Sequence, residues 1–368
     1  MDARRSQFAF AFLAEENPLE SDERMASTGT KLSIGEVAHP KRKISELFRF
    51  PFDFEDRGSG IAVGDARHLL QKFPENTFRC CITSPPYWGL RDYGVTDQIG
   101  AEMELNQYIE DVTAVFREVR RVLQTDGSLW LNIGDAYTSG NRTWRDADKK
   151  NPARGMSYRP PTPTGLKPKD LIGIPWKLAF ALQQDGWYLR SDIVWYKPNC
   201  QPESVKDRPT RSHEYVFLLT KSEDYYYDWE AIREQSRTKS GGRNKRTVWS
   251  VNTEPFPDAH FATFPASLIE PMVLAGTVPE DLVLDPFFGS GTVGAVCQNL
   301  NRRFVGIELK AEFADIALKR LGWKGMGHEN KRKRISGAAA GTSDFTLVAP
   351  PVPAGPLPAR RTQKYRRS

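Results

Sequence analysis

The tetrapeptide Ser84-Pro85-Pro86-Tyr87 directly follows a short apolar run, and its residue types suit one kind of ligand. A serine hydroxyl and a proline carbonyl can accept hydrogen bonds from both N–H groups of an amine. Each proline fixes φ and keeps the preceding residue extended, and a tyrosine ring can stack on a planar base. Such acceptors could localise the lone pair of a nucleobase amine, which is otherwise a poor nucleophile. A rigid turn after a strand is the alternative interpretation.

A glycine-rich segment later in the chain resembles a cofactor loop. Residues 285–292 read Asp-Pro-Phe-Phe-Gly-Ser-Gly-Thr, and the next apolar run ends in Glu308. Strand, glycine turn, helix, strand and then an acid is the order that binds an adenosine-containing cofactor at the carboxyl edge of an open sheet. The glycines from Gly289 onward also match the GxGxxG pattern of NAD-binding proteins. The extra carboxylate of Asp285 favours a cationic amino-acid ligand, and therefore S-adenosylmethionine.

The elements around these motifs alternate between strands and helices. Apolar runs at 60–63, 78–83 and 128–133 predict strands, and i, i+3, i+4 spacing over 105–123 predicts an amphipathic helix. Further strands are expected at 187–196, 215–220, 282–284 and 304–307, and further helices at 170–184, 265–275 and 313–321, with another helix opening after the glycine-rich segment. This order predicts an α/β fold: a doubly wound, Rossmann-like and mostly parallel sheet.

The distribution of charge indicates a polyanionic partner. The net charge is only +6, but segments 141–169, 231–251 and 324–368 carry +6, +5 and +8, so the remainder carries −13. Clustered Lys and Arg gain affinity by releasing counterions from phosphates, which makes double-stranded DNA the leading partner. Solvated surface is the alternative for any single segment.

Cysteines and apolar runs exclude several other classes. The four cysteines, at 80, 81, 200 and 297, show no spacing typical of a zinc site or a disulfide framework, so no metal is expected. No apolar run near the start is long enough for a signal peptide or a membrane span, and a cytoplasmic location is expected.

With both motifs in this order, the chain resembles the beta class of DNA amino-methyltransferases, over about residues 60–322. Their catalytic motif is (Ser/Asp/Asn)-Pro-Pro-(Tyr/Phe), and it precedes the cofactor motif, which is a circular permutation of the motif order. The resemblance implies S-adenosylmethionine as cofactor and catalytic roles for Ser84, Pro85, Pro86 and Tyr87. It implies cofactor-binding roles for Asp65, Asp285, Phe287, Gly289, Gly291, Thr292 and Glu308.

The resemblance also implies a target and a domain organisation. Ser-Pro-Pro-Tyr is associated mainly with cytosine N4, and adenine N6 is the alternative. Cytosine C5 chemistry needs a Pro-Cys nucleophile, which Asn199-Cys200 only approximates. The expected parts are an extension (1–55), a catalytic half (56–228) with a mobile basic loop (138–170), a target-recognition segment (229–259), a cofactor half (260–323) and a disordered tail (324–368). The candidate DNA contacts are Arg243, Lys245, Arg246 and Trp249.

Other interpretations accompany this one. A nicotinamide oxidoreductase and a non-catalytic DNA-binding protein are the rival functions. A homodimer is a candidate assembly, and a restriction endonuclease that acts on the same site is a candidate partner. His213-Glu214 resembles an acid/base pair, but a structural or DNA-contacting role is the preferred interpretation.

Overall fold

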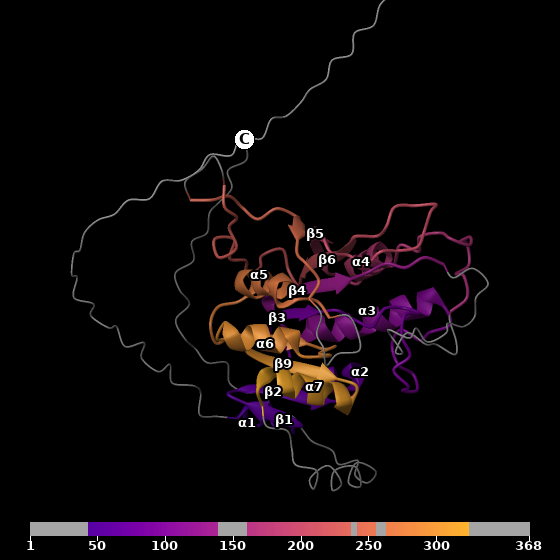
Figure 1. Cartoon of the computed structure of the whole chain (residues 1–368). Helices are drawn as coiled ribbons and strands as arrows, with labels where there is room; N and C mark the ends of the chain where they lie inside the picture. The colour runs from indigo at the N-terminus through magenta and orange to yellow at the C-terminus, as the bar shows by residue number, and fades with distance from the viewer. Residues whose placement is uncertain (1–42, 139–159, 237–240, 255–262, 324–368) are drawn as a thin grey trace, which may run out of the picture. The chain divides into compact units, whose positions relative to one another are not determined.

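A single mixed sheet runs through the part of the chain that the structure describes (Figure 1). The structure is a computed structural model that describes residues 43–138, 160–236, 241–254 and 263–323, all within one compact unit, His39–Ser368. The strands are β1 (Phe54–Asp56), β2 (Ser59–Val63), β3 (Phe78–Thr83), β4 (Leu123–Ile133), β5 (Tyr188–Tyr196), β6 (His213–Thr220), β7 (Val248–Ser250), β8 (Leu282–Asp285) and β9 (Arg303–Glu308).

The strand order in space is β1-β2-β9-β8-β3-β4-β6-β5-β7. The five strands from β2 to β4 in this order are parallel to one another. Strand β1 pairs antiparallel with β2, and β6 pairs antiparallel with both β4 and β5. Strands β8 and β9 come last in the chain but lie between β2 and β3. The predicted α/β, mostly parallel fold with permuted order is therefore confirmed.

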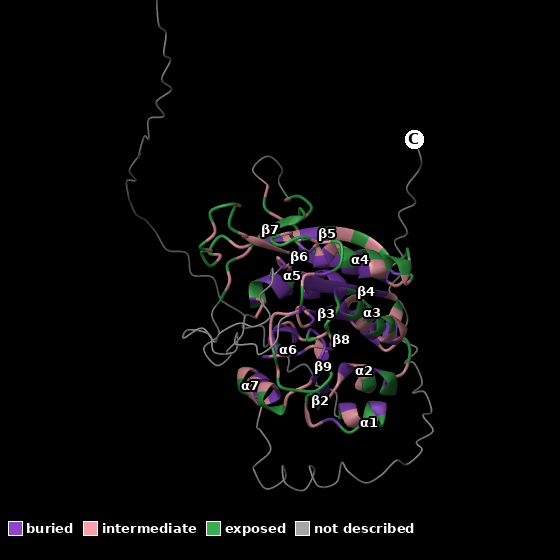
Figure 2. Ribbon diagram, turned by 90° about the vertical axis from the view of Figure 1, so that its right-hand side faces the viewer, coloured by how far each residue is buried: buried purple, intermediate pink, exposed green. Residues whose placement is uncertain are grey.

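Helices cover both faces of this sheet. They are α1 (Ile44–Phe48), α2 (Ala66–Leu69) with the 3-10 turn η1 (Leu70–Lys72), α3 (Leu105–Val122), α4 (Ile174–Gln184), α5 (Ala266–Gly276), α6 (Thr292–Asn299) and α7 (Ala311–Leu321). One core contains the buried sides of α1 to α4, and the other contains those of α5 to α7. Buried residues gather along the central strands between these layers (Figure 2).

The local sequence explains why these elements form where they do. In β3, Cys81 faces one core while Cys80 and Ile82 face the other, as the twofold period of a strand requires. Helix α3 buries an unbroken stripe that includes Val112, Phe116 and Val119. Helix α4 begins with Pro at its first turn, and the carboxylate of Asp135 accepts hydrogen bonds from the Gly173 and Ile174 amides.

The expected boundary at residue 55 falls inside a packed unit. Phe48, Phe50 and Phe52 are buried, and their rings contact that of Phe73 at centroid distances of 5.2 to 6.1 Å. Phe48 also contacts Phe78 at 6.2 Å. The alternating aromatic residues therefore complete the core beside α1 and β1. Residues 1–42 of the predicted extension and the predicted tail from 324 lie outside the described residues.

The basic segments are described only in part. Residues 139–159 of the predicted mobile loop lie outside the description, but its ends are tied together, since Thr138 donates a hydrogen bond from its hydroxyl to the Lys167 carbonyl at 2.8 Å. Within the predicted target-recognition segment, β7 pairs parallel with β5. Sequence patterns did not indicate this strand.

Candidate active site

The ends of β3 and β8 bring the two chemical motifs together. These strands are parallel neighbours, and the Thr83 hydroxyl donates a hydrogen bond to Asp285 Oδ1 at 2.7 Å, across 202 positions of sequence. Ser84 follows Thr83 directly, and the glycine turn follows Asp285 directly. The tetrapeptide and the glycine-rich segment therefore lie side by side at the carboxyl edge of the sheet, where open α/β sheets bind ligands.

The carboxylate of Asp285 is buried and only half satisfied. Its Oδ1 accepts hydrogen bonds from Thr83 and from the Phe287 amide at 3.1 Å, whereas its Oδ2 has no hydrogen-bond partner among the described residues. Burial raises the pKa of Asp285 to about 7, partly offset by the Thr83 hydrogen bond. A buried carboxylate of this kind is stabilised by a cationic group beside it.

Glu308 holds the glycine turn from the next strand. Its Oε2 accepts a hydrogen bond from the Gly289 amide at 2.7 Å, and its Oε1 accepts one from the Lys310 amide at 2.9 Å. Burial raises the pKa of Glu308 to about 7. The Gly64 amide donates to the Glu308 carbonyl at 2.8 Å, which brings the end of β2 to the same place.

The glycine turn requires its glycines for two reasons. Gly289 and Gly291 have φ of 53° and 77°, which other residues rarely adopt. At Gly291 a Cβ atom would also lie 2.8 Å from Ala317 Cβ on α7. Beneath the turn Phe288 is buried against Phe304, while Phe287 stays half-buried with its ring 6.5 Å from Phe116.

Two of the predicted cofactor residues already have protein partners. Asp65 accepts a hydrogen bond from the Arg67 amide and pairs with the Arg67 guanidinium at 2.5 Å. Arg67 holds the pKa of Asp65 below its usual range, against the effect of burial. The Thr292 hydroxyl accepts a hydrogen bond from Arg320 on α7. Cofactor contacts by Asp65 and Thr292 remain predictions, and they would have to add to these bonds or replace them.

The tetrapeptide Ser84–Tyr87 is held by a polar network that the sequence did not reveal. The Tyr87 hydroxyl donates a hydrogen bond to Glu214 Oε2 at 2.9 Å and lies 3.5 Å from Ser84 Oγ. Asn132 Nδ2 donates to the same Glu214 oxygen at 3.2 Å, and Lys197 Nζ lies 2.5 Å from Glu214 Oε1. Burial, and then the charge of Glu214, raise the pKa of Tyr87 well above its usual value.

The tyrosine ring has a defined place beside a cavity. A Cβ atom at Gly134 would lie 2.8 Å from Tyr87 Cε2, so glycine at 134 leaves room for the ring. Behind the tetrapeptide, Tyr108 donates from its hydroxyl to the Pro86 carbonyl at 2.9 Å. A cavity of about 80 Å³ is lined by Tyr87, Gly134, Asp135, Pro160 and others. This cavity is the candidate entry for a flat ligand.

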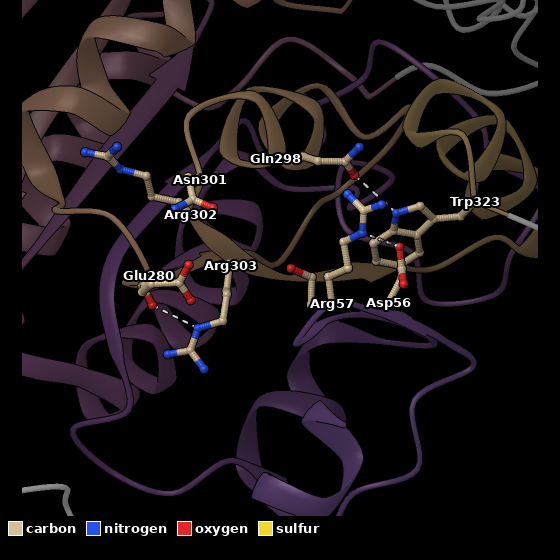
Figure 3. A pocket seen from close by; sticks show the side chains of 9 residues that line it. Asp56, Arg57, Glu280, Gln298, Asn301, Arg302, Arg303 and Trp323 are labelled. Atoms are coloured by element: carbon tan, nitrogen blue, oxygen red, sulfur yellow. Dashed lines mark hydrogen bonds and ion pairs between the residues drawn. The ribbon is translucent and has the colours of Figure 1, made fainter. Parts of the chain in front are cut away.

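Another pocket lies at the opposite edge of the sheet (Figure 3). It is lined by residues at the starts of β2 and β9 and just before β8, among them Arg57, Glu280, Arg303 and Trp323. The Arg303 Nε donates to the Glu280 carbonyl at 2.8 Å, so this arginine serves the packing of the strand start. Because both motifs lie at the carboxyl ends of the strands, this pocket is not part of their site.

The candidate DNA contacts form a cluster around one carboxylate. Arg243 Nε and Arg246 Nε lie 3.2 and 3.4 Å from Glu234 Oε2, and Lys245 Nζ lies 4.0 Å from Glu234 Oε1. Three cations on one anion leave a net positive surface. Trp249 differs, because its side chain is 4% exposed and its indole packs 6.3 Å from Trp130. The prediction of Trp249 as a direct DNA contact is therefore corrected: it anchors β7 in the core.

The described residues add three further findings. They contain no cluster of three or more His, Cys, Asp or Glu side chains that could hold a metal ion. None of the helices described is both long and apolar enough to cross a membrane. Cys80, Cys81 and Cys297 are buried, and burial raises the pKa of each thiol, which suits packing rather than nucleophilic chemistry.

Comparison with known proteins places these features in a family. The family model of the N6 and N4 DNA methylases matches residues 78–319. The chain is 62% identical over 284 residues to Type II methyltransferase M.Cfr9I of Citrobacter freundii, covering 77% of this chain and 93% of that protein. It is 64% identical over 266 residues to Type II methyltransferase M.SmaI of Serratia marcescens, covering 72% and 91%.

Solved structures show the same fold at lower identity. The PvuII DNA methyltransferase (cytosine-N4-specific) superimposes with a TM-score of 0.54 at 21% identity, covering 76% of this chain and 91% of that chain. A DNA modification methylase from Thermus thermophilus, complexed with S-adenosyl-L-methionine, gives a TM-score of 0.50 at 23% identity, covering 73% and 95%. The chain thus belongs to the N6/N4 family of DNA methylases and is a DNA methyltransferase that uses S-adenosylmethionine.

Proposed function

We propose that this chain methylates the exocyclic N4 of cytosine at a specific site in double-stranded DNA. The single observation that carries the proposal is Ser84, a neutral hydroxyl at the first position of the tetrapeptide. It directly follows Thr83, whose hydroxyl is bonded to the buried carboxylate of Asp285. Serine at this position is associated mainly with cytosine N4 in the family that the sequence resembles. Adenine N6 is the second candidate, since the exocyclic amine of adenine needs the same acceptors.

The glycine turn and its carboxylates fit the cofactor. The bare Oδ2 of Asp285 suits the ammonium group, and Glu308, at the end of the following strand, suits the ribose hydroxyls. Gly289 and Gly291 have positive φ, which lets the backbone make this tight turn at the end of β8. When bound here, S-adenosylmethionine supplies an electrophilic methyl group. The protein contributes a site where a carboxylate and a ribose-binding acid are already in place.

The tetrapeptide orients the nucleophile. Ser84 and the Pro85 carbonyl accept hydrogen bonds from the two N–H groups of the target amine, which favours a pyramidal nitrogen. Pro85 and Pro86 keep these acceptors fixed, and the Tyr108 hydroxyl anchors the Pro86 carbonyl. Attack is direct, without a covalent bond between enzyme and DNA, and the nitrogen loses one proton as it is methylated.

The base must leave the duplex to reach Ser84. Flipping costs a few kcal/mol of unstacking, and stacking on the Tyr87 ring returns roughly 1–3 kcal/mol. The cavity beside Tyr87 lies where such a base would enter. We assign the positive cluster of Arg243, Lys245 and Arg246 to DNA contacts, since a net positive surface gains affinity from phosphates.

Identification of the modified nucleoside tests the proposal. Plasmid DNA incubated with the chain and methyl-labelled cofactor is digested to nucleosides and analysed by mass spectrometry. Labelled N4-methylcytosine supports the proposal. Labelled N6-methyladenine replaces it with the second candidate, and labelled C5-methylcytosine contradicts both.

A restriction endonuclease is the partner we infer in the cell. Both curated relatives described above are Type II methyltransferases, and their identity with this chain exceeds 60%. Methylation at the recognition site should then protect DNA from an endonuclease that cuts the same site. Fully methylated plasmid that is cleaved as fast as unmethylated plasmid by that endonuclease would contradict this inference.

A further inference from the structure

The hydrogen-bond network around Tyr87 has a direction, and Glu214 sets it. A carboxylate only accepts hydrogen bonds, so the Tyr87 hydroxyl donates its single proton to Glu214 Oε2 at 2.9 Å. The other acceptor in reach, Asn132 Oδ1, is farther away at 3.5 Å. The Tyr87 oxygen is then left with lone pairs, and Ser84 Oγ is 3.5 Å away. Ser84 can therefore donate toward Tyr87 and keep its own lone pairs for the target amine.

Two neighbours keep Glu214 in this role. Lys197 Nζ, 2.5 Å from Oε1 and over the Trp195 ring at 4.1 Å, compensates the charge of the carboxylate. Asn132 donates from Nδ2 both to Glu214 Oε2 and to the Tyr215 carbonyl at 3.1 Å, which fixes its amide. The side chains of Lys197 and Glu214 are 17% and 18% exposed, so the pair is largely shielded from water.

Backbone pairing places Glu214 at this point. It lies at the start of β6, and its neighbour Tyr215 pairs with Ile133 at the end of β4, antiparallel. This pairing brings Glu214 beside Asn132 and Gly134, where a Cβ at Gly134 would lie 3.3 Å from the Glu214 carboxyl carbon. The carboxylate thus approaches the tetrapeptide from a strand 127 positions away in sequence.

We propose that Glu214 is a positioning residue for methyl transfer, which orders the hydroxyls of Tyr87 and Ser84 so that Ser84 presents an acceptor to the target amine. The inference rests on the proposed role of Ser84, and holds for cytosine or adenine alike. In this role Glu214 acts through the hydroxyl of Tyr87, to which it is bonded directly. The amine then meets an acceptor whose orientation is set before it arrives, which lowers the reorganisation needed for attack.

Glu214→Gln tests the direction of the network. The amide keeps the size of the side chain, but its NH₂ can donate to Tyr87 and reverse the order of the bonds. We expect kcat to fall about tenfold to a hundredfold, with KM for DNA and for S-adenosylmethionine within about twofold of the parent. Glu118→Gln on α3, which also removes an ion-paired carboxylate, is the matched control and should leave kcat unchanged.

A double-mutant cycle with Tyr87→Phe separates positioning from a merely structural role. Phenylalanine keeps the ring but removes the hydroxyl through which Glu214 acts. In that background, Glu214→Gln should reduce kcat by less than about twofold further. An equal loss in both backgrounds would overturn the inference. If Glu214→Gln does not fold, as judged by circular dichroism, Glu214→Asp enters the same cycle with the same expected non-additivity.

The outcome is distinguishable from failure of the proposed function. The unmodified chain must first give labelled nucleoside, and the identity of that nucleoside tests the target base. The cycle compares rates among variants that form the same product. Production of N6-methyladenine would therefore contradict the proposed target base and leave the inference about Glu214 intact. If the product is N4-methylcytosine but the two substitutions have additive effects on kcat, only the inference about Glu214 is contradicted.

Discussion

The two sides of the proposed active site, one for the cofactor and one for the base, satisfy their carboxylates in different ways. On the cofactor side, Asp285 and Glu308 are buried, bonded mainly to backbone amides, and their pKa is raised to about 7. On the base side, Glu214 has Lys197, Tyr87 and Asn132 as partners. The cofactor side therefore gains most from a cationic ligand, whereas the base side is already compensated.

This difference indicates that one side of the site serves ligand binding and the other serves orientation of the hydroxyl groups. Burial makes a carboxylate costly to ionise, and a bound cation offsets that desolvation cost. Such a carboxylate therefore favours binding of a cationic ligand. A carboxylate that already has its partners instead fixes the geometry of neutral hydroxyls around it. The hydrogen bond between Thr83 and Asp285 joins the two sides directly.

The most severe way to break the base side is Ser84→Ala. Removing one preorganised group typically costs about a hundredfold to a thousandfold in kcat. We expect a loss of that size in methyl transfer from labelled cofactor, with unchanged affinity for S-adenosylmethionine in calorimetry. Methyl transfer at the parent rate would remove Ser84 from the mechanism, and a parallel loss of cofactor affinity would show that the two sides are not separable.

Gly291→Ala breaks the cofactor side. The left-handed backbone and the approach of Ala317 Cβ together should lower the free energy of unfolding by about 2–4 kcal/mol. Gly322→Ala is the control, since Gly322 has φ of 69° but no described atom within 4 Å of the added Cβ, and should cost only about 1–2 kcal/mol. Equal costs in urea unfolding would show that the contact with α7 is unimportant.

The pH dependence of cofactor affinity sharpens the contrast. A carboxyl group with a pKa of about 7 is neutral below that pH and anionic above it, so its attraction for a cation is weak at low pH and grows as pH rises. Affinity for S-adenosylmethionine should therefore increase about tenfold between about pH 5.5 and 7.5. Asp285→Asn should bind more weakly and with a flatter profile, and a parent profile without slope would refute the raised pKa.

The smallest effect is expected where DNA meets the surface. Arg246→Gln should weaken DNA binding about twofold to fivefold at moderate salt and reduce the slope of log affinity against log salt by about 1. Arg117→Gln is a matched control, because Arg117 is similarly exposed and also pairs with a carboxylate, but lies on α3. Identical salt slopes for both variants would argue against a phosphate contact by Arg246.

Much of this fold could be predicted from sequence because its elements have strong local patterns. The strand at 78–83 has its predicted limits, and the helix at 105–123 differs by one residue at its end. The strand preceding each motif was recognisable from its apolar run and the residues that stop it. Membership of the DNA methylase family excludes the two rival functions. These were a nicotinamide oxidoreductase, suggested by the GxGxxG pattern, and a non-catalytic DNA-binding protein, suggested by the charge.

The parts that escaped prediction depend on contacts distant in sequence. Glu214 stood out beside His213, but only the pairing of β6 with β4 places it on Tyr87. Trp249 lies among basic residues, which suggested a DNA contact, yet β7 carries its ring to Trp130 in the core. The aromatic residues before 55 alternate along the chain, but Phe48 ends α1 and Phe54 begins β1, so they form no single strand. They are buried because they pack against Phe73 and Phe78, which come later in the sequence.

The late position of β8 and β9 in the chain has a consequence for synthesis. Until residues 282–308 leave the ribosome, β2 and β3 lack the two strands that lie between them in the finished sheet. Each then exposes an unpaired backbone edge, a template for association between nascent chains. Completion of the sheet therefore coincides with the meeting of the two motifs, since β8 and β9 end in Asp285 and Glu308.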